Sequence, residues 1–250
     1  MRPNERPEIR RLPLFRDMRS EQFDSLMQAA YAQVFPAQLD LITQGDRADF
    51  LHIIVEGSVE LYAGWQRRET TMAILRPVGT FILAACIRDQ PYLMSARTLE
   101  KSRIVLVPAP DLREVFARDT AFAHAIVNEL AQCYRSTIRH AKNLKLRTSR
   151  ERLAAYVLRQ SQREGDAPSF IIPVEKRMLA SYLGMTPENL SRAFRALQDN
   201  GVRIDGHRVI ITDRPALGAL AGPDPLLDGP DPDAVESADA GESDRARRFN

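Results

Sequence analysis

The part of the chain that most constrains its fold is residues 171–211, with the sequence IIPVEKRMLASYLGMTPENLSRAFRALQDNGVRIDGHRVII. This pattern predicts a helix, a tight turn, a second helix and a small β-hairpin. Two short helices joined by a turn that contains glycine are typical of the helix-turn-helix motif, in which the second helix enters the major groove of DNA. The segment therefore predicts a DNA-binding unit.

Residues with specific backbone preferences mark the limits of both helices. The first helix is expected at about residues 174–183, and Gly184 follows it where a positive φ is required. Thr186 is a good N-cap for the second helix, and Pro187 fits the first helical position, where no backbone donor is needed. The second helix should therefore begin directly after Thr186.

This second helix should have one apolar face and one polar face. Leu190, Phe194 and Leu197 recur at three- and four-residue spacing, so they should face inward. On the polar face, an arginine can donate two hydrogen bonds to guanine, a glutamate can accept one from cytosine, and a serine can bond either way. The candidate DNA-binding residues are Thr186, Glu188, Asn189, Ser191, Arg192, Arg195, His207 and Arg208.

A hairpin is expected after the second helix. Residues 202–204 and 208–211 alternate in polarity around Asp205-Gly206, which is the strongest short-range hairpin signal. This hairpin would be the wing of a winged helix-turn-helix domain. The alternative is an ordinary pair of helices in a helical core, with Arg192 as a solvated charge. The turn glycine, the capped second helix, its polar face and the wing together favour DNA binding.

Composition sets the broad class of the protein. The chain has 250 residues, enough for two domains, with 44% hydrophobic and 27% charged residues. Its two cysteines, Cys86 and Cys133, are too few for a disulfide framework and fit a reducing compartment. No segment approaches the ~20 apolar residues of a membrane span, and the N-terminus lacks the apolar core of a secretion signal. We therefore expect a cytoplasmic protein that has no membrane partner.

The net charge of +2 hides an asymmetry between the C-terminal end and the rest. Residues 222–250 contain eight acidic and three basic residues, a balance of −5, which leaves about +7 for the remainder. A modest basic excess suits contacts with DNA phosphates. The C-terminal end is rich in Pro, Gly and Asp and poor in aromatic residues, so it is predicted to be a disordered acidic tail.

The N-terminal half changes pattern near Ala32. Residues 12–30 resemble a single entry helix, and from residue 32 to 108 short alternating runs are separated by Gly, Pro or Asp. One of these runs, TMAILRPVGTFILAAC at 71–86, is among the expected strand regions. Many short strands at such spacing predict an antiparallel sandwich or barrel.

A helical stretch follows the predicted strands. A short helix is expected after Pro110, and a longer one should be capped by Thr120 and continue to about residue 146. A heptad seam along the long helix suggests that two copies of the chain associate. The alternative is packing against the chain's own β domain, because Phe122 and Ile126 widen the apolar face. The candidate dimerisation residues are Val127, Leu130, Tyr134, Thr137, Ala141 and Leu144.

These segments resemble the CRP/FNR family of bacterial transcription regulators over about residues 12–215. The resemblance is carried by the Gly45-Asp46 turn, by LHIIVEGSVELY at 51–62, by Gly79-Thr80-Phe81 and by LASYLGMTPENLSRAFRALQDNGVRI at 179–204. It implies an α+β protein: an N-terminal antiparallel β-roll like the cyclic-nucleotide-binding jelly roll, a long dimerisation helix and a C-terminal winged helix-turn-helix. The resemblance also implies a homodimer and a regulator rather than an enzyme.

The expected domains follow from this comparison. They are an N-terminal segment with the entry helix (1–31), a β-roll sensor domain (32–109), a short helix plus the long dimerisation helix (110–146), a winged helix-turn-helix domain (147–221) and a disordered acidic tail (222–250). A hinge is expected near residues 143–148, before a further helix at about 149–164.

The second helix of the motif is similar to the FNR branch of the family. The FNR-type pattern of Glu, two residues, Ser and Arg is matched by Glu188, Ser191 and Arg192, and Pro187 stands where the cyclic AMP branch has an arginine. The resemblance implies an inverted repeat with TTGA-like half-sites in double-stranded DNA, read by a homodimer whose recognition helices lie about 34 Å apart. It also implies RNA polymerase as a partner.

The sensor segment, which follows the Gly79-Thr80-Phe81 turn, differs from the sequence of the cyclic AMP branch. Leu83 and Ala84 stand where cyclic-nucleotide-binding members have a Gly-Glu pair for the ribose, and Met94-Ser95 replaces the Arg-Ser pair for the phosphate. A buried phosphate needs a cationic or multi-donor partner, so cyclic AMP binding of the usual kind is not expected. A hydrophobic effector, or none, is the alternative. The candidate effector-pocket residues are Leu83, Ala84, Cys86, Met94, Ser95 and Thr137.

The sequence also bears on two other cofactors and on one other function. An FNR-type iron–sulfur cluster needs four cysteine thiolates, and the N-terminus of this chain has none, so a cluster is not expected. A haem-based sensor of CO, NO or redox state stays open, without a preferred ligand among His52, His124, His140, Cys86 and Met94. The remaining alternative is a cyclic-nucleotide-type regulatory subunit of an enzyme. The sequence shows no cluster of metal ligands.

Overall fold

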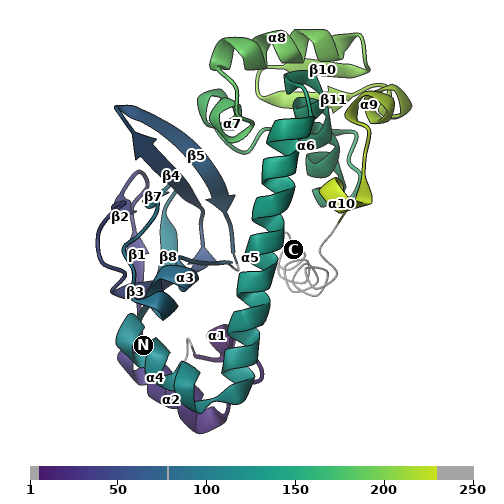
Figure 1. The fold of residues 1–250 in the computed structure, drawn as a ribbon. Helices are drawn as coiled ribbons and strands as arrows, with labels where there is room; N and C mark the ends of the chain where they lie inside the picture. Colours follow the sequence, from purple (N-terminus) through teal and green to yellow (C-terminus); the bar gives the residue numbers. More distant parts are fainter. Residues whose placement is uncertain (1–5, 78, 230–250) are drawn as a thin grey trace, which may run out of the picture. The chain divides into compact units, whose positions relative to one another are not determined.

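The computed structural model describes residues 6–77 and 79–229. The chain divides into two compact units, one ending at Cys133 and the other beginning at Tyr134 (Figure 1). The long helix α5 (Thr120–Leu146) contributes its first half to the first unit and its second half to the second unit. Among the described residues, no helix has the length and apolar character needed to cross a membrane.

The N-terminal segment forms two short helices and not the single helix expected over residues 12–30. Helix α1 (Arg6–Arg10) was not anticipated, and α2 (Ser20–Ala29) begins only at Ser20. Between them the backbone forms turns, with the amides of Phe15 and Arg16 both bonded to the carbonyl of Leu12. Pro13 lies within this stretch and cannot donate a helical hydrogen bond. Phe15 is nevertheless fully buried.

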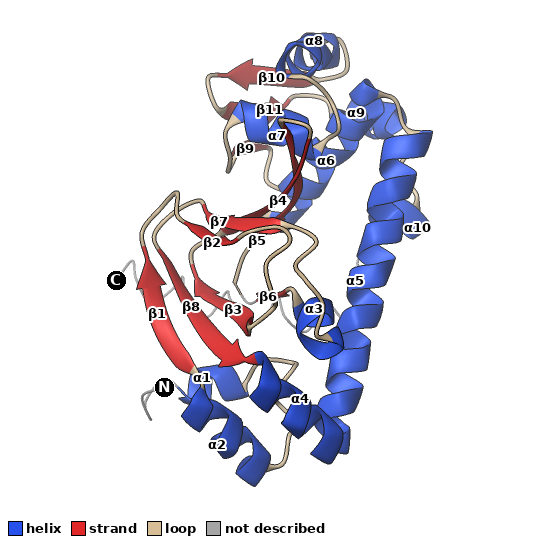
Figure 2. Cartoon of the chain, turned by 60° about the vertical axis from the view of Figure 1, so that its left-hand side comes forward, coloured by secondary structure: helices blue, strands red, loops and turns tan. Residues whose placement is uncertain are grey.

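Eight strands form two four-stranded antiparallel sheets, which confirms the predicted β-roll (Figure 2). One sheet has the order β1-β8-β3-β6 and the other has the order β2-β7-β4-β5. The strands are β1 (Tyr31–Phe35), β2 (Asp40–Ile42), β3 (Phe50–Glu56), β4 (Val59–Trp65), β5 (Arg68–Leu75), β6 (Gly79–Phe81), β7 (Ser95–Thr98) and β8 (Ser102–Pro108).

The turn between β3 and β4 depends on a glycine. Gly57 has φ of +89°, and a Cβ placed there would lie 2.7 Å from the backbone Cα of Ser102. Only glycine combines this backbone conformation with so close an approach of β8. The sequence block around Gly57 thus fixes where the two sheets connect.

The sensor segment contains a helix where the sequence suggested a strand. Helix α3 (Leu83–Arg88) follows β6, and its Leu83 and Cys86 lie three residues apart and are both buried. The run FILAAC is uniformly apolar, and such short runs do not distinguish a buried strand from a buried helix. Ala84 and Ala85 are good helix formers, which accords with the observed result.

Helices α4 (Ala109–Arg118) and α5 follow β8. The residue that caps α5 is Asp119, not Thr120 as predicted: its carboxylate accepts hydrogen bonds from the amides of Phe122 (3.0 Å) and Arg19 (2.8 Å). Thr120 is already the first helical residue. Phe122 is fully buried in the core of the first unit, where its ring stacks on Phe15 with centroids 5.9 Å apart.

The second unit is a winged helix-turn-helix domain, as predicted. A three-stranded sheet of order β10-β11-β9 accompanies its helices, and β9 was not anticipated from the sequence. The elements after α5 are α6 (Ser149–Arg163), β9 (Ser169–Ile171), α7 (Lys176–Tyr182), α8 (Pro187–Gln198), β10 (Val202–Asp205), β11 (Arg208–Ile211), α9 (Arg214–Ala221) and α10 (Pro225–Asp228).

The first part of the predicted acidic tail is ordered. Residues 222–229 include α10, whose start is capped by the carboxylate of Asp224 on the amide of Leu226 (2.7 Å). Asp228 forms ion pairs with Arg147 and Arg159. Composition alone predicts disorder here, because it contains no information about partners that are distant in the sequence, such as Arg147 and Arg159. The rest of the predicted tail, residues 230–250, lies outside the described residues.

Candidate DNA-binding interface

Helix α8 begins as the sequence predicts. The hydroxyl oxygen of Thr186 accepts a hydrogen bond from the amide of Asn189 (3.2 Å), and Pro187 occupies the first helical position. Gly184 in the preceding turn has φ of +62°, the left-handed conformation that glycine adopts without strain. These local signals set where α7 ends and α8 begins.

The two faces of α8 differ in polarity as expected. Leu190, Phe194 and Leu197 are buried in the core of the second unit together with Ala193. The opposite face is exposed to solvent and lies on the outside of the unit (Figure 1). Its exposed members are Glu188, Asn189, Ser191, Arg192 and Arg195.

Hydrogen bonds within the first turns of α8 orient several of these side chains. The guanidinium of Arg192 donates from Nη2 to Oδ1 of Asn189 (2.7 Å), and the hydroxyl of Ser191 donates to the carbonyl of Pro187 (3.0 Å). Hydrogen bonds from its own backbone amide and from the hydroxyl of Thr186 hold the pKa of Glu188 below its ordinary value. Glu188 is therefore an ionised acceptor, and Arg192 is a donor next to it.

The wing carries the remaining candidates. Strands β10 and β11 pair from Val202 opposite Ile211 to Asp205 opposite Arg208, with Gly206 at positive φ in the turn. His207 and Arg208 are both exposed. Arg208 also donates from Nη1 to the hydroxyl of Ser169 on β9 (3.3 Å), which ties the wing to the third strand.

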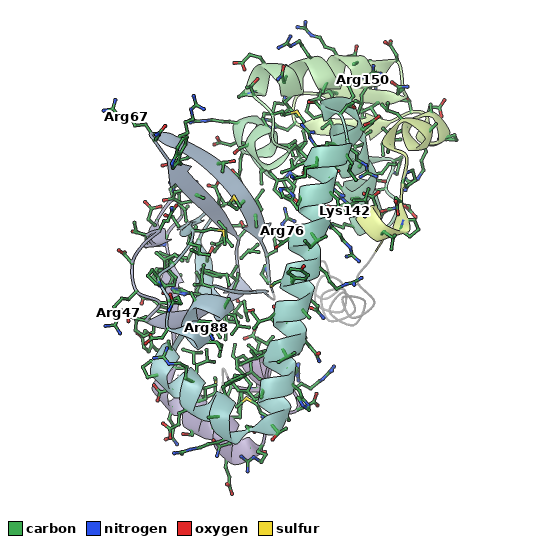
Figure 3. All side chains as sticks on the ribbon, viewed as in Figure 1. Arg47, Arg67, Arg76, Arg88, Lys142 and Arg150 are labelled. Carbon is green, nitrogen blue, oxygen red and sulfur yellow. The ribbon has the colours of Figure 1, made fainter. Side chains whose placement is uncertain are left out.

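Sequence reasoning missed further cations of the second unit. Arg150, on the first turn of α6, is exposed and donates from Nη2 to Oδ1 of Asn200, just after α8 (3.2 Å; Figure 3). Lys176 and Arg177 are exposed at the start of α7. In protein–DNA complexes, cations of this kind typically contact phosphates and carry no base specificity, so a search for base readers does not select them. Their position in first helical turns was the available signal.

The structure places the predicted effector residues in different environments. Leu83 and Cys86 are buried in the core of the first unit, and Met94 is partly buried against that core. The hydroxyl oxygen of Ser95 accepts a hydrogen bond from the amide of Gln44 (2.9 Å). Ala84 is exposed. Thr137 is exposed on the part of α5 that belongs to the second unit.

The sensor segment does not offer the cation that a buried phosphate requires. Within residues 79–95, all of which are described, Arg88 is the one arginine or lysine, and it is exposed at the end of α3 (Figure 3). Arg97, two residues further along β7, is already engaged, because its Nε donates to the carboxylate of Asp40 (2.9 Å) and its guanidinium lies over the ring of Tyr62. The residues present therefore do not fit a cyclic nucleotide bound in the usual way.

The residues considered as haem ligands are also constrained. Burial raises the pKa of the Cys86 thiol to about 12, so this group is not poised as a thiolate. His124 is exposed, and the ring of His140 lies 5.3 Å from that of Tyr182. No group of three or more His, Cys, Asp or Glu side chains in the described part of the chain could hold a metal ion.

His52 is the most deeply buried histidine among these groups. It is 4% exposed on β3, its ring stacks on Phe81 at 4.9 Å, and its Nδ1 has no hydrogen-bond partner among the described residues. Burial lowers the pKa of His52 from 6.5 to about 4. The imidazole is therefore neutral in the folded first unit at neutral pH.

The neutral state of His52 predicts acid sensitivity. Between pH 6.5 and 4 the unfolded chain binds more protons at His52 than the folded unit does. The stabilising contribution of neutral His52 to the free energy of unfolding is therefore fully present above about pH 6.5, and it is lost as the pH is lowered towards 4. The loss should approach ~3 kcal/mol, at roughly 1.4 kcal/mol per unit of pKa. Chemical unfolding at several pH values should show this dependence. This pH dependence of the free energy of unfolding should disappear in His52→Leu and persist in His124→Ala. If the dependence is unchanged in His52→Leu, it comes from other titratable groups.

Comparison with known proteins decides between the interpretations of this architecture. Residues 32–119 match the cyclic nucleotide-binding domain family, and residues 151–220 match the Crp-like helix-turn-helix domain family. The chain belongs to the CRP/FNR family of transcription regulators. It is thus a DNA-binding regulator of the CRP/FNR type, as its sequence suggested.

Individual relatives agree with this assignment. The chain is 24% identical over 187 residues to the transcriptional activator protein FnrA of Stutzerimonas stutzeri, covering 73% of this chain and 77% of that protein. It is 25% identical over 193 residues to the CRP-like cAMP-activated global transcriptional regulator of Mycobacterium tuberculosis, covering 75% and 86%. The structure of FixK2 from Bradyrhizobium japonicum has the same fold, with a TM-score of 0.67, 22% identity, and coverage of 78% and 98%.

Proposed function

We propose that this regulator acts as a homodimer that reads an inverted repeat with TTGA-like half-sites. The observation that carries the proposal is the exposed first part of α8, where Glu188, Ser191 and Arg192 stand on a rigid, capped helix. An ionised glutamate and an arginine on one face provide an acceptor and a donor for base edges. Arg150, Lys176 and the wing residue Arg208 supply phosphate contacts around this face.

The surface of α5 supports the dimeric state. Val127 is 57% exposed and Tyr134 is 68% exposed, whereas Phe122 and Ile126 on another face of the same helix are fully buried. Ile138, which was not among the predicted seam residues, is also 43% exposed. The helix therefore has one apolar face buried within the first unit and a second apolar face that a partner helix can cover. Leu130 can contribute to both apolar faces, because it is only partly buried against the core of the first unit.

We further propose that the β-roll responds to an effector other than cyclic AMP, or holds the regulator competent without one. Two observations support this view: residues 79–95 contain no buried arginine or lysine, and Leu83 and Cys86 are buried in an apolar core. RNA polymerase is the partner through which bound protein would alter transcription.

A titration of purified protein on labelled duplexes at stated salt tests the proposal. The TTGA inverted repeat should bind 10³-fold or more tightly than a duplex with scrambled half-sites, a ratio that specific protein–DNA complexes typically reach or exceed. A duplex with one intact half-site should bind far more weakly than the full repeat. Sedimentation should give a dimer. Equal affinity for the repeat and the scrambled duplex, or a monomer on DNA, would overturn the proposal.

A further inference from the structure

Two segments that are distant in the sequence meet at the junction between α5 and α6. Arg147 is the first residue after α5, and its guanidinium donates to both carboxylate oxygens of Asp228, at 2.8 Å from Nη1 and 2.5 Å from Nη2. The same guanidinium donates to Oδ1 of Asn143 (3.2 Å) and to the carbonyl of Gly222 (3.1 Å). Arg159 on α6 donates to Oδ1 of Asp228 (3.0 Å). One carboxylate thus connects the junction, α6 and the segment after α9.

This contact is largely shielded from water. The side chains of Arg147 and Asp228 are 6% and 13% exposed. Burial alone would raise the pKa of Asp228, but hydrogen bonds from Arg147 and from the amide of Asp224 hold it below its ordinary value. The carboxylate is therefore ionised and paired on two sides. Removing one partner of such a pair leaves a buried charge without compensation, which strongly destabilises the local arrangement.

The same junction is bonded directly to the turn that precedes α8. Arg152, a buried residue of α6, donates from Nη1 to the carbonyl of Arg147 (2.7 Å) and from Nε to the carbonyl of Leu183 (2.8 Å). Its Nη2 donates to the carbonyl of Gly184 (3.2 Å). One side chain therefore bridges the backbone at Arg147 and the turn that leads into α8.

We propose that Asp228 is a positioning residue that locks the α5–α6 junction and thereby sets the spacing of DNA half-sites that the dimer accepts. The inference rests on the proposed function, because spacing has meaning only for a dimer that reads a repeat. Residues 222–229 are then a working part of the DNA-binding unit, although the match to the helix-turn-helix family ends at residue 220.

The physical basis of this spacing preference is the stiffness of the connection between α5 and α8. Adding one base pair between half-sites moves the second site by about 3.4 Å and rotates it by roughly 34° around the duplex. A locked junction cannot follow this displacement, so affinity falls when the spacer is wrong. An unlocked junction can follow it, so affinity depends less on spacing while each half-site is still read by the same side chains.

The test compares full-length variants on repeats whose spacer is optimal, one base pair shorter or one base pair longer. The wild-type protein should prefer the optimal spacer at least tenfold, and Asp228→Asn should reduce this preference to about threefold or less. Asp166→Asn is the matched control, because Asp166 also pairs with an arginine of the second unit, Arg214, but on an exposed surface. It should keep the wild-type spacing preference.

Hydrogen exchange of the free protein supplies a readout that does not depend on DNA. Amides of residues 143–149 should exchange at least tenfold faster in Asp228→Asn and at the wild-type rate in Asp166→Asn. If Asp228→Asn does not fold, Arg159→Gln, which removes only the more exposed partner, should show smaller changes in the same direction. If Asp228→Asn and Arg159→Gln both keep the wild-type exchange rates and the wild-type spacing preference, the proposed lock is wrong. Failure of the wild-type protein to bind any repeat would instead overturn the proposed function, and the exchange data would still decide the lock.

Discussion

Replacing Arg192 by alanine is expected to weaken binding to the TTGA inverted repeat by ~2–6 kcal/mol, or from about 30-fold to more than 10⁴-fold. A bidentate arginine contact to guanine contributes ~1–3 kcal/mol of discrimination, and a dimer loses this contact in both half-sites. Arg192 is exposed at the N-terminal part of α8, and its removal leaves the buried face of the helix unchanged. The loss should therefore appear in DNA binding and not in folding.

The duplex sequence distinguishes this role from a phosphate contact. Affinity for a scrambled duplex should change by only a few-fold in Arg192→Ala, and base preference should relax at the guanine of each half-site. Arg163→Ala removes an equal charge from an exposed position of α6 and serves as the control. An equal loss on both duplexes would mean that Arg192 contacts the backbone, and no loss on either would place the base-reading surface elsewhere.

The sequence predicted the DNA-binding unit well because its signals are local. Thr186, Pro187 and Gly184 act through their own backbone preferences, and the structure shows each in the expected role. The alternation around Asp205-Gly206 is equally local, and the hairpin forms there. By contrast, the apolar run that became α3 carried no periodicity that separates helix from strand.

The sequence does not show which residues far apart in the chain come into contact. The Pro, Gly and Asp residues around Asp228 predict a disordered tail, yet its partner Arg147 lies 81 residues earlier. Asp119 and Thr120 are adjacent and both are good capping residues, and only the structure shows that the Asp119 carboxylate accepts from the helix amide of Phe122. The exposed polar face of α8 could be predicted from residue spacing, whereas the hydrogen-bond network around Arg147, Arg152 and Asp228 required the tertiary structure.

Phe122→Ala should lower the stability of the first unit by ~3–5 kcal/mol, the range measured when a buried phenylalanine is truncated. Phe122 is fully buried, it stacks on Phe15, and its helix is anchored beside it by the carboxylate of Asp119. Alanine would leave a cavity at the point where α5 joins the β-roll core. Because the two units need not unfold together, the measurement is the midpoint of the first unit in chemical denaturation, followed by hydrogen exchange of β3 and β8.

His124→Ala is the matched control, because His124 is exposed two residues later on the same helix. It should change stability by no more than ~0.5 kcal/mol, as is usual for surface substitutions. A similar small effect of Phe122→Ala would mean that α5 is not packed into the first unit and that its apolar residues are all available to a partner. A large effect confined to Phe122 would instead show that this face of α5 belongs to the core of the first unit, which leaves the exposed Val127 and Tyr134 available to a second copy of the chain.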